Sequence, residues 1–85
     1  MARRQVNATG KSNGDITKLC KGSEFWSPRQ KADAISDIES GTYRYYVAWP
    51  EKETEIRVVN GPTGKYLRTD RDNTTRNNLD DLPDC

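Results

Sequence analysis

The clearest pattern along the chain is a helical one between residues 27 and 41. Ser27, Pro28 and Gln30 match a capping box with proline at the first helical position, and Gly41 can take the left-handed conformation that ends a helix. Three apolar residues between these positions fall on one narrow stripe: Ala34, Ile35 and Ile38. The charged residues of the segment are expected to point outward: Arg29, Asp33, Asp37 and Glu39.

Alternation of apolar and polar positions predicts four short strands. One precedes the helix, at residues 16–20, and three follow it, at residues 42–49, 53–59 and 65–69. Short turns join the last three, so they should form an antiparallel meander. The helical stripe can be buried only against one face of that sheet. We therefore expect an α+β fold of order β-α-β-β-β, with one helix packed on an antiparallel sheet of three to four strands.

The two ends of the chain are polar and lack periodicity. We expect residues 1–15 to be a disordered basic arm and residues 16–85 to be a single small α+β domain. Residues 69–78 are ten hydrogen-bonding side chains in a row, which favours an ordered polar loop with local turns. Leu79 and Leu82 are expected to hold this loop on the sheet through one short helical turn before Pro83.

Composition restricts the class of protein. The 85 residues allow one domain, and a mean hydropathy of −1.05 predicts a small core. There is no histidine, which excludes every mechanism that needs an imidazole. The longest apolar run, residues 45–49, is far shorter than the roughly 20 residues of a membrane span, and no secretory signal pattern is present. We expect a cytoplasmic protein that does not enter a membrane.

The two cysteines, Cys20 and Cys85, have no neighbouring histidine and no metal-ligand spacing. We expect two free thiols, as is usual in the cytosol. A disulfide between them would require the tail to fold back onto the strand that contains Cys20. A core this small commonly needs the support of a disulfide, a metal or a partner.

Charge is distributed unevenly. Residues 1–31 hold seven basic and two acidic residues, a net of +5, whereas residues 32–85 hold seven basic and eleven acidic residues, a net of −4. The basic part could lie on phosphates. The acidic part opposes a broad nucleic-acid surface.

Several short pieces of sequence, taken in this order, resemble a small bacterial family known as domain of unknown function 3892: Phe25-Trp26-Ser27, Ala34-Ile35, Ile38-Glu39-Ser40-Gly41, Tyr45-Tyr46-Val47, Lys65-Tyr66-Leu67-Arg68-Thr69, Asp72-Asn73-Thr74-Thr75 and Asn77-Asn78-Leu79-Asp80-Asp81-Leu82-Pro83. The resemblance covers residues 16–85. It implies the strand–helix–meander architecture and an origin in bacteria or their mobile elements. It implies no activity and no catalytic residues.

The polar tail offers the best candidates for catalysis. Asp70 and Asp72 could face the same way, with Arg68 and Arg71 nearby. An alternating run of acids and bases is more typical of a self-paired surface loop. We therefore expect no enzymatic activity, no cofactor and no metal.

A binding module remains, in three alternative forms. A protein partner, or a second copy of the chain, could dock on sheet edges and exposed aromatic rings. Nucleic acid could stack on those rings and contact the basic arm. The candidate binding surface for both is Tyr43, Arg44, Tyr45, Tyr46, Trp49 and Arg57. A small anion such as a nucleotide could bind the polar loop, through Arg68, Thr69, Arg71, Asn73, Thr74 and Asn77. The first form is the leading hypothesis.

Overall fold

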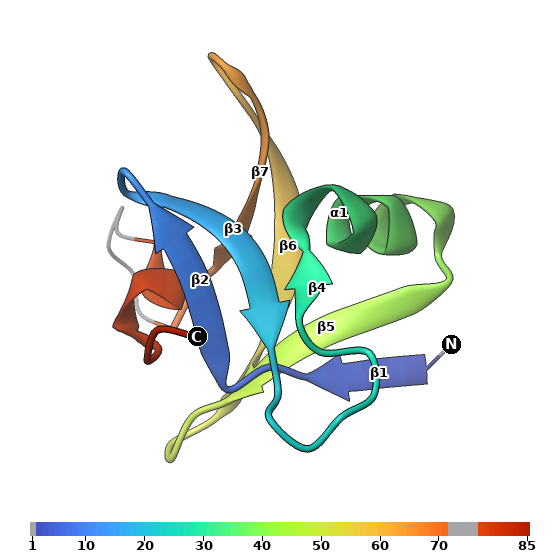
Figure 1. The fold of residues 1–85 in the computed structure, drawn as a ribbon, viewed down its shortest axis with the longest axis vertical. Coiled ribbons are helices and arrows are strands. Elements are labelled where there is room, and N and C mark those ends of the chain that lie inside the picture. The colour runs from blue at the N-terminus through green and yellow to red at the C-terminus, as the bar shows by residue number, and fades with distance from the viewer. Residues whose placement is uncertain (1, 72–76) are drawn as a thin grey trace.

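Two small β-sheets and one helix form the fold (Figure 1). The computed structural model describes residues 2–71 and 77–85. One sheet has four strands in the order β1-β5-β6-β7, and the other has three in the order β2-β3-β4. The elements are β1 (Ala2–Gln5), β2 (Ala8–Ser12), β3 (Asp15–Cys20), β4 (Arg29–Gln30), α1 (Lys31–Ser40), β5 (Tyr43–Ala48), β6 (Glu53–Gly61), β7 (Gly64–Thr69) and the 3-10 helix η1 (Asn78–Asp81). The expected α+β class is confirmed.

The N-terminal segment is the largest departure from expectation. It forms two strands instead of a disordered arm. β1 runs parallel to β5, from Ala2 opposite Tyr43 to Gln5 opposite Tyr46, and β2 pairs antiparallel with β3. Val6, between the two strands, is fully buried, and its N–H donates to the Tyr46 carbonyl at 2.8 Å. The expected order β-α-β-β-β is therefore wrong, because main-chain pairing, of β1 with the distant β5 and of β2 with the adjoining β3, orders a segment that has almost no apolar pattern of its own.

The helix begins later than the capping box predicts. Ser27 and Pro28 are joined by a cis peptide bond, and the Ser27 hydroxyl accepts a hydrogen bond from the Lys21 N–H at 2.9 Å. The next two residues form β4 against β3. The C-terminal end is confirmed: Gly41 has φ 76° and its N–H bonds the last turn. At ten residues α1 is short, and within residues 2–71 and 77–85 no helix is long and apolar enough to cross a membrane.

The helix packs against the inner face of the four-stranded sheet. Ala34 is fully buried, and Ile35 and Ile38 pack against the core, as the stripe predicts. Asp37 was expected to point outward, but it is only 7% exposed. Periodicity places it on the buried face, three residues after Ala34, and a partner for its charge is supplied by Arg29.

The meander forms as expected. β5, β6 and β7 are antiparallel neighbours, with Val47 opposite Thr54 and Val58 opposite Leu67. A two-residue turn between Gly61 and Gly64 joins β6 to β7. The buried core combines both sheets, the helix and the tail: Val6, Ile16, Leu19, Ala34, Tyr45, Val47, Ile56, Leu67 and Leu79.

The polar tail ends in the expected helical turn before Pro83. Leu79 in η1 is fully buried, and Leu82 packs on the core. Asn77 fixes the start of the turn, because its side chain accepts from the Leu79 N–H at 3.1 Å and donates to the Leu67 carbonyl at 2.9 Å. The turn is therefore attached directly to β7.

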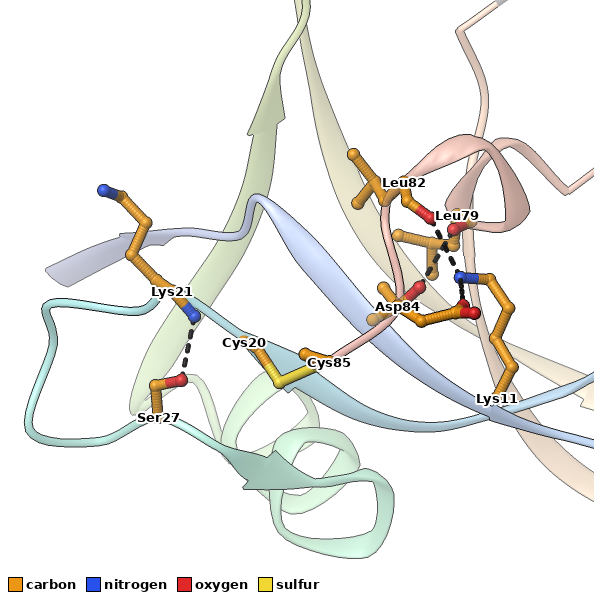
Figure 2. The surroundings of a disulfide bond; sticks show 9 residues. Lys11, Cys20, Lys21, Ser27, Leu79, Leu82, Asp84 and Cys85 are labelled. Carbon is orange, nitrogen blue, oxygen red and sulfur yellow. Dashed lines mark hydrogen bonds and ion pairs between the residues drawn. A yellow bond between two sulfur atoms is a disulfide. The ribbon is translucent and has the colours of Figure 1, made fainter.

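Cys20 and Cys85 form a disulfide, so the expectation of two free thiols is wrong. The tail folds back along β2, where Thr9 exchanges main-chain hydrogen bonds with Pro83 and Cys85 at 2.9 and 3.1 Å. Figure 2 shows the Lys11 ammonium donating to the Leu82 carbonyl and to Asp84 beside the disulfide. Spacing along the sequence could not reveal this pairing, since it depends on β2, which the sequence pattern did not indicate.

Candidate functional site

An open cleft of about 450 Å³ lies beside β1, and we call it the β1 cleft. β1 forms one side of it and the loop that leads from β3 to β4 forms the other; the two segments pass each other in Figure 1. Four aromatic side chains line it: Phe25, Trp26, Tyr43 and Tyr46. Its charged lining residues are Arg3, Arg4, Lys21 and Glu24. The β1 cleft therefore combines aromatic walls with an excess of positive charge.

Arg4 occupies the centre of the aromatic cluster. Its guanidinium carbon lies 3.5 Å from the ring centre of Tyr43, 5.3 Å from that of Trp26 and 5.9 Å from that of Phe25. The side chain is only 10% exposed. Cation–π contact and stacking hold such a guanidinium in one orientation.

A buried network of polar side chains holds the Arg4 guanidinium in place. Its Nη1 donates to the Tyr45 hydroxyl at 2.9 Å, and that hydroxyl donates to Asp37 Oδ2 at 2.6 Å. Arg29 binds the same carboxylate with two hydrogen bonds of 3.0 Å. Burial raises the pKa of Asp37, but the hydrogen bonds from Arg29 and Tyr45 outweigh it and hold the pKa below its usual value. Burial, followed by the bond to Asp37, raises the pKa of Tyr45.

The rim of the cleft is more exposed. Phe25 is 91% exposed, the largest exposure of any large apolar side chain in the described ranges. Arg3 lies over the ring of Tyr46, with 4.1 Å between guanidinium carbon and ring centre. It also forms ion pairs with Glu53 and Glu55 at 3.6 and 3.5 Å. The charge of Arg3 is thus largely balanced by β6.

β1 is also an edge strand. It has a neighbour, β5, on one side only. Because the Val6 N–H bonds β5, the alternation along a parallel strand turns the N–H and C=O groups of Arg3 and Gln5 away from β5. In the part of the chain that the structure describes, no hydrogen bond joins either residue to the loop across the cleft. These groups are available to a further strand.

Residues 4–83 match the model of a family described as a protein of unknown function, DUF3892. The chain belongs to the DUF3892 family. The match starts within β1, so it takes in the end of β1, all of β2 and the region of the resemblance as far as Pro83. No curated protein and no solved structure matches the chain significantly.

In this DUF3892 protein the predicted aromatic surface is divided among three places. Tyr43 and Tyr46 line the β1 cleft. Tyr45 is fully buried in the core, and Trp49 is half-buried, with its indole N–H donating to Thr54 Oγ1 at 2.8 Å. The remaining two predicted residues are exposed on β5 and β6: Arg44 and Arg57.

The described side chains of the predicted anion loop are engaged by other groups of the DUF3892 chain. Arg68 and Arg57 both bind Asp70, which lowers the pKa of that carboxyl. Arg71 pairs with Glu51 and lies over the ring of Trp49 at 4.5 Å. The other members are a buried Thr69, the structural Asn77, and Asn73 and Thr74, which lie outside the described residues.

Sequence reasoning missed Arg3, Arg4, Lys21, Phe25 and Trp26 as site residues. The first two were assigned to a disordered arm. One clue was available: Phe25 and Trp26 are large aromatic residues in a polar segment with no apolar periodicity to bury both. Arg4 gives no such clue, because its neighbours in space come from β5 and the β3–β4 loop.

Proposed function

We propose that this protein is a small non-enzymatic binding module that receives an extended segment of a protein partner along β1. The observation that carries the proposal is that the β1 cleft adjoins a sheet edge with available main-chain groups. A strand added at such an edge gains main-chain hydrogen bonds, and an adjacent pocket selects its side chains.

The size and lining of the β1 cleft support this function. A volume of about 450 Å³ lies within the range of about 300–1,000 Å³ that is usual for ligand clefts. Phe25 projects an almost fully exposed ring at its rim. Aromatic and arginine residues are the side chains that most often dominate the binding energy of protein interfaces. We assign Phe25, Tyr43 and Tyr46 as the principal contacts for side chains of the partner.

The compartment in which the module acts is a separate proposal. A cytoplasmic location stays a prediction, and the Cys20–Cys85 disulfide weighs against it, because disulfides persist mainly in oxidising compartments. The redox state of the two cysteines in cells, measured by thiol alkylation, tests this point.

Selection of peptides from a random phage-displayed library on the immobilised oxidised protein tests the function. Selected peptides would be titrated into ¹⁵N-labelled protein. We expect the largest amide shifts in β1 and in residues 21–26, with smaller changes elsewhere. Alternate nitrogens of the bound peptide face β1, so peptides would be methylated on one alternate set of nitrogens or on the other. Only the set that faces β1 should abolish binding, since its methylation removes the main-chain donors that pair with β1.

Two variants sharpen the result. Phe25→Ser should weaken peptide binding about tenfold, the effect of losing an interface aromatic, without affecting stability. Val59→Ser, on β6 away from the cleft, is the matched control and should bind normally. Peptides that shift other surfaces, or that tolerate Phe25→Ser, would contradict the proposal.

Nucleic acid is the alternative outcome. Tight binding of an oligonucleotide that weakens steeply between about 50 and 200 mM salt, without shifts in β1, would replace the peptide function. A dimer in native mass spectrometry that blocks the peptides would instead identify a second copy of the chain as the occupant of the edge.

A further inference from the structure

We infer that Arg4 makes the β1 cleft a carboxylate site, so that the bound segment presents an acidic side chain or a terminal carboxylate next to an aromatic or apolar group. The inference relies on the proposed function for the source of this ligand. It deepens that function, because it states what chemistry the cleft selects.

The first observation is an imbalance of charge beneath the cleft. Two guanidinium groups, those of Arg4 and Arg29, face a single carboxylate, that of Asp37. Arg29 takes both oxygens of this carboxylate at 3.0 Å, whereas Arg4 approaches only to 4.0 Å. Within ion-pair distance the cluster therefore holds two cations and one carboxylate, and Arg4 has the weaker share of it, while Asp33 acts on Arg29 at longer range. A nine-tenths buried cation with an incomplete partner is costly, and an anion in the cleft would relieve that cost.

The second observation concerns the donors of Arg4. Nη1 donates to the Tyr45 hydroxyl at 2.9 Å. Nε and Nη2 donate to no group in the described part of the chain, and no buried side-chain nitrogen there lacks a partner. These two nitrogens are therefore not completely buried, and the β1 cleft is the cavity that Arg4 lines. Nε and Nη2 lie on the same edge of a guanidinium, which is the edge that binds a carboxylate with two parallel hydrogen bonds.

The third observation is that the guanidinium is held in place before any ligand arrives. The ring of Tyr43 lies 3.5 Å from its carbon on one side, and Tyr45 fixes Nη1. Pre-organised donors lose little freedom on binding, which raises affinity. The lining has two further cations: Arg3, which is paired with Glu53 and Glu55, and Lys21, which is opposed by the acidic Glu24.

The walls beside Arg4 define the rest of the ligand. The rings of Phe25 and Trp26 lie 5.9 and 5.3 Å from the guanidinium carbon. A group attached to the carboxylate would meet these rings, so an aromatic or branched apolar group is favoured. A segment that pairs with Arg3 and Gln5 on the β1 edge would bring its side chains to this position.

The test compares two probes that differ in one functional group. N-acetyl-L-phenylalanine carries the carboxylate, and N-acetyl-L-phenylalaninamide replaces it with a neutral amide. Each would be titrated into ¹⁵N-labelled oxidised protein at pH 7, with the Arg4 Nε–H and Trp26 indole N–H resonances as reporters. We expect the acid to bind at least about tenfold more tightly than the amide, as for hydrogen bonds to a charged group, and to shift both reporters.

The matched variants are Arg4→Lys and Arg57→Lys. Arg4→Lys keeps the charge and removes the two-pronged donor edge, so it should reduce the preference for the acid at least fivefold. Arg57→Lys, on the exposed side of β6, should leave it unchanged. A dispersed ¹⁵N spectrum of each variant shows that it is folded. Phe25→Ser, at a position that is 91% exposed, provides a second variant that should weaken the binding of both probes.

The outcomes separate this inference from the proposed function. Equal binding of acid and amide, or shifts outside the cleft, would overturn the carboxylate site even if selected peptides bind along β1. If the protein strongly prefers the acid but binds no peptide, the carboxylate site is supported and the proposed peptide function is overturned. Tighter binding of adenosine monophosphate than of the acid would overturn the carboxylate inference in favour of a nucleotide.

Discussion

Removal of the Cys20–Cys85 disulfide should cost this small protein a large part of its stability. The cysteines are 65 residues apart. In the loop-closure treatment, a cross-link over about 65 residues lowers the entropy of the unfolded chain enough to stabilise the fold by about 4 kcal/mol at 25 °C. Natural domains are stable by only about 5–15 kcal/mol, so the reduced protein should lie close to its unfolding threshold.

Cys85→Ser is the cleanest perturbation. Cys85 is exposed, so serine creates no cavity there, whereas Cys20 is buried and is best left unchanged. The free energy of unfolding would be measured by urea titration for the oxidised protein, the protein with reductant, and Cys85→Ser with and without reductant. We expect the last three to agree and to fall about 4 kcal/mol below the first.

Part of the tail should stay docked without the bond. Leu79 remains buried, and the Thr9 hydroxyl still donates to its carbonyl at 3.1 Å. The variant should therefore fold at low temperature with a native-like spectrum. A difference below about 1 kcal/mol between the oxidised protein and Cys85→Ser would refute the reasoning, because the bond would then not restrict the unfolded chain as the loop length requires. Two free thiols in protein purified without reductant would refute the pairing itself.

Two further predictions concern the helix. Arg29 and Tyr45 hold the pKa of Asp37 below its unfolded value, so the stability that Asp37 contributes is present above about pH 4 and is lost as the pH falls through the folded pKa. Asp37→Asn should therefore flatten the decline in unfolding free energy between about pH 5 and 2. Parallel curves of unfolding free energy against pH for the variant and the wild type would contradict this. Gly41→Ala should lower the unfolding free energy by about 1 kcal/mol, because φ is 76° there. Thermal melts would compare this variant with the wild type and with the exposed control Ser36→Ala. A melting temperature of Gly41→Ala equal to that of the wild type would contradict the left-handed conformation assigned to Gly41.

Local patterns were sufficient to predict about half of the fold. Alternation marked β3 and the meander, Gly41 marked the end of the helix, and Leu79 marked the buried turn of the tail. Each of these depends on residues that are close in sequence. The capping box was a local pattern as well, but the Ser27 hydroxyl bonds the Lys21 N–H instead, and the helix starts at Lys31.

The remainder depends on contacts between distant segments. β1 contains Arg3, Arg4 and Gln5, and nothing in their chemistry predicts a strand; the unpaired edge of β5 provides the reason for one. The β1 cleft could not be predicted from the sequence for the same reason, because its main cation, Arg4, and its exposed ring, Phe25, are 21 residues apart. Asp37 was accessible in principle, because helical periodicity places it on the buried face.

The parallel pairing of β1 with β5 has a consequence for how the protein folds. Arg4 meets Tyr45 across 41 residues, and Thr9 meets Leu79 across 70. Folding rates fall as contacting residues become more distant in sequence, because chain entropy is lost before the contacts form. A chain of this length rich in local helical contacts could fold in microseconds to milliseconds, whereas this topology belongs with the proteins that need milliseconds to seconds. β2 can pair with β3 as soon as residue 20 has been synthesised, but β1 has no partner until β5 follows, so the nascent chain emerges with the edge of β1 unprotected.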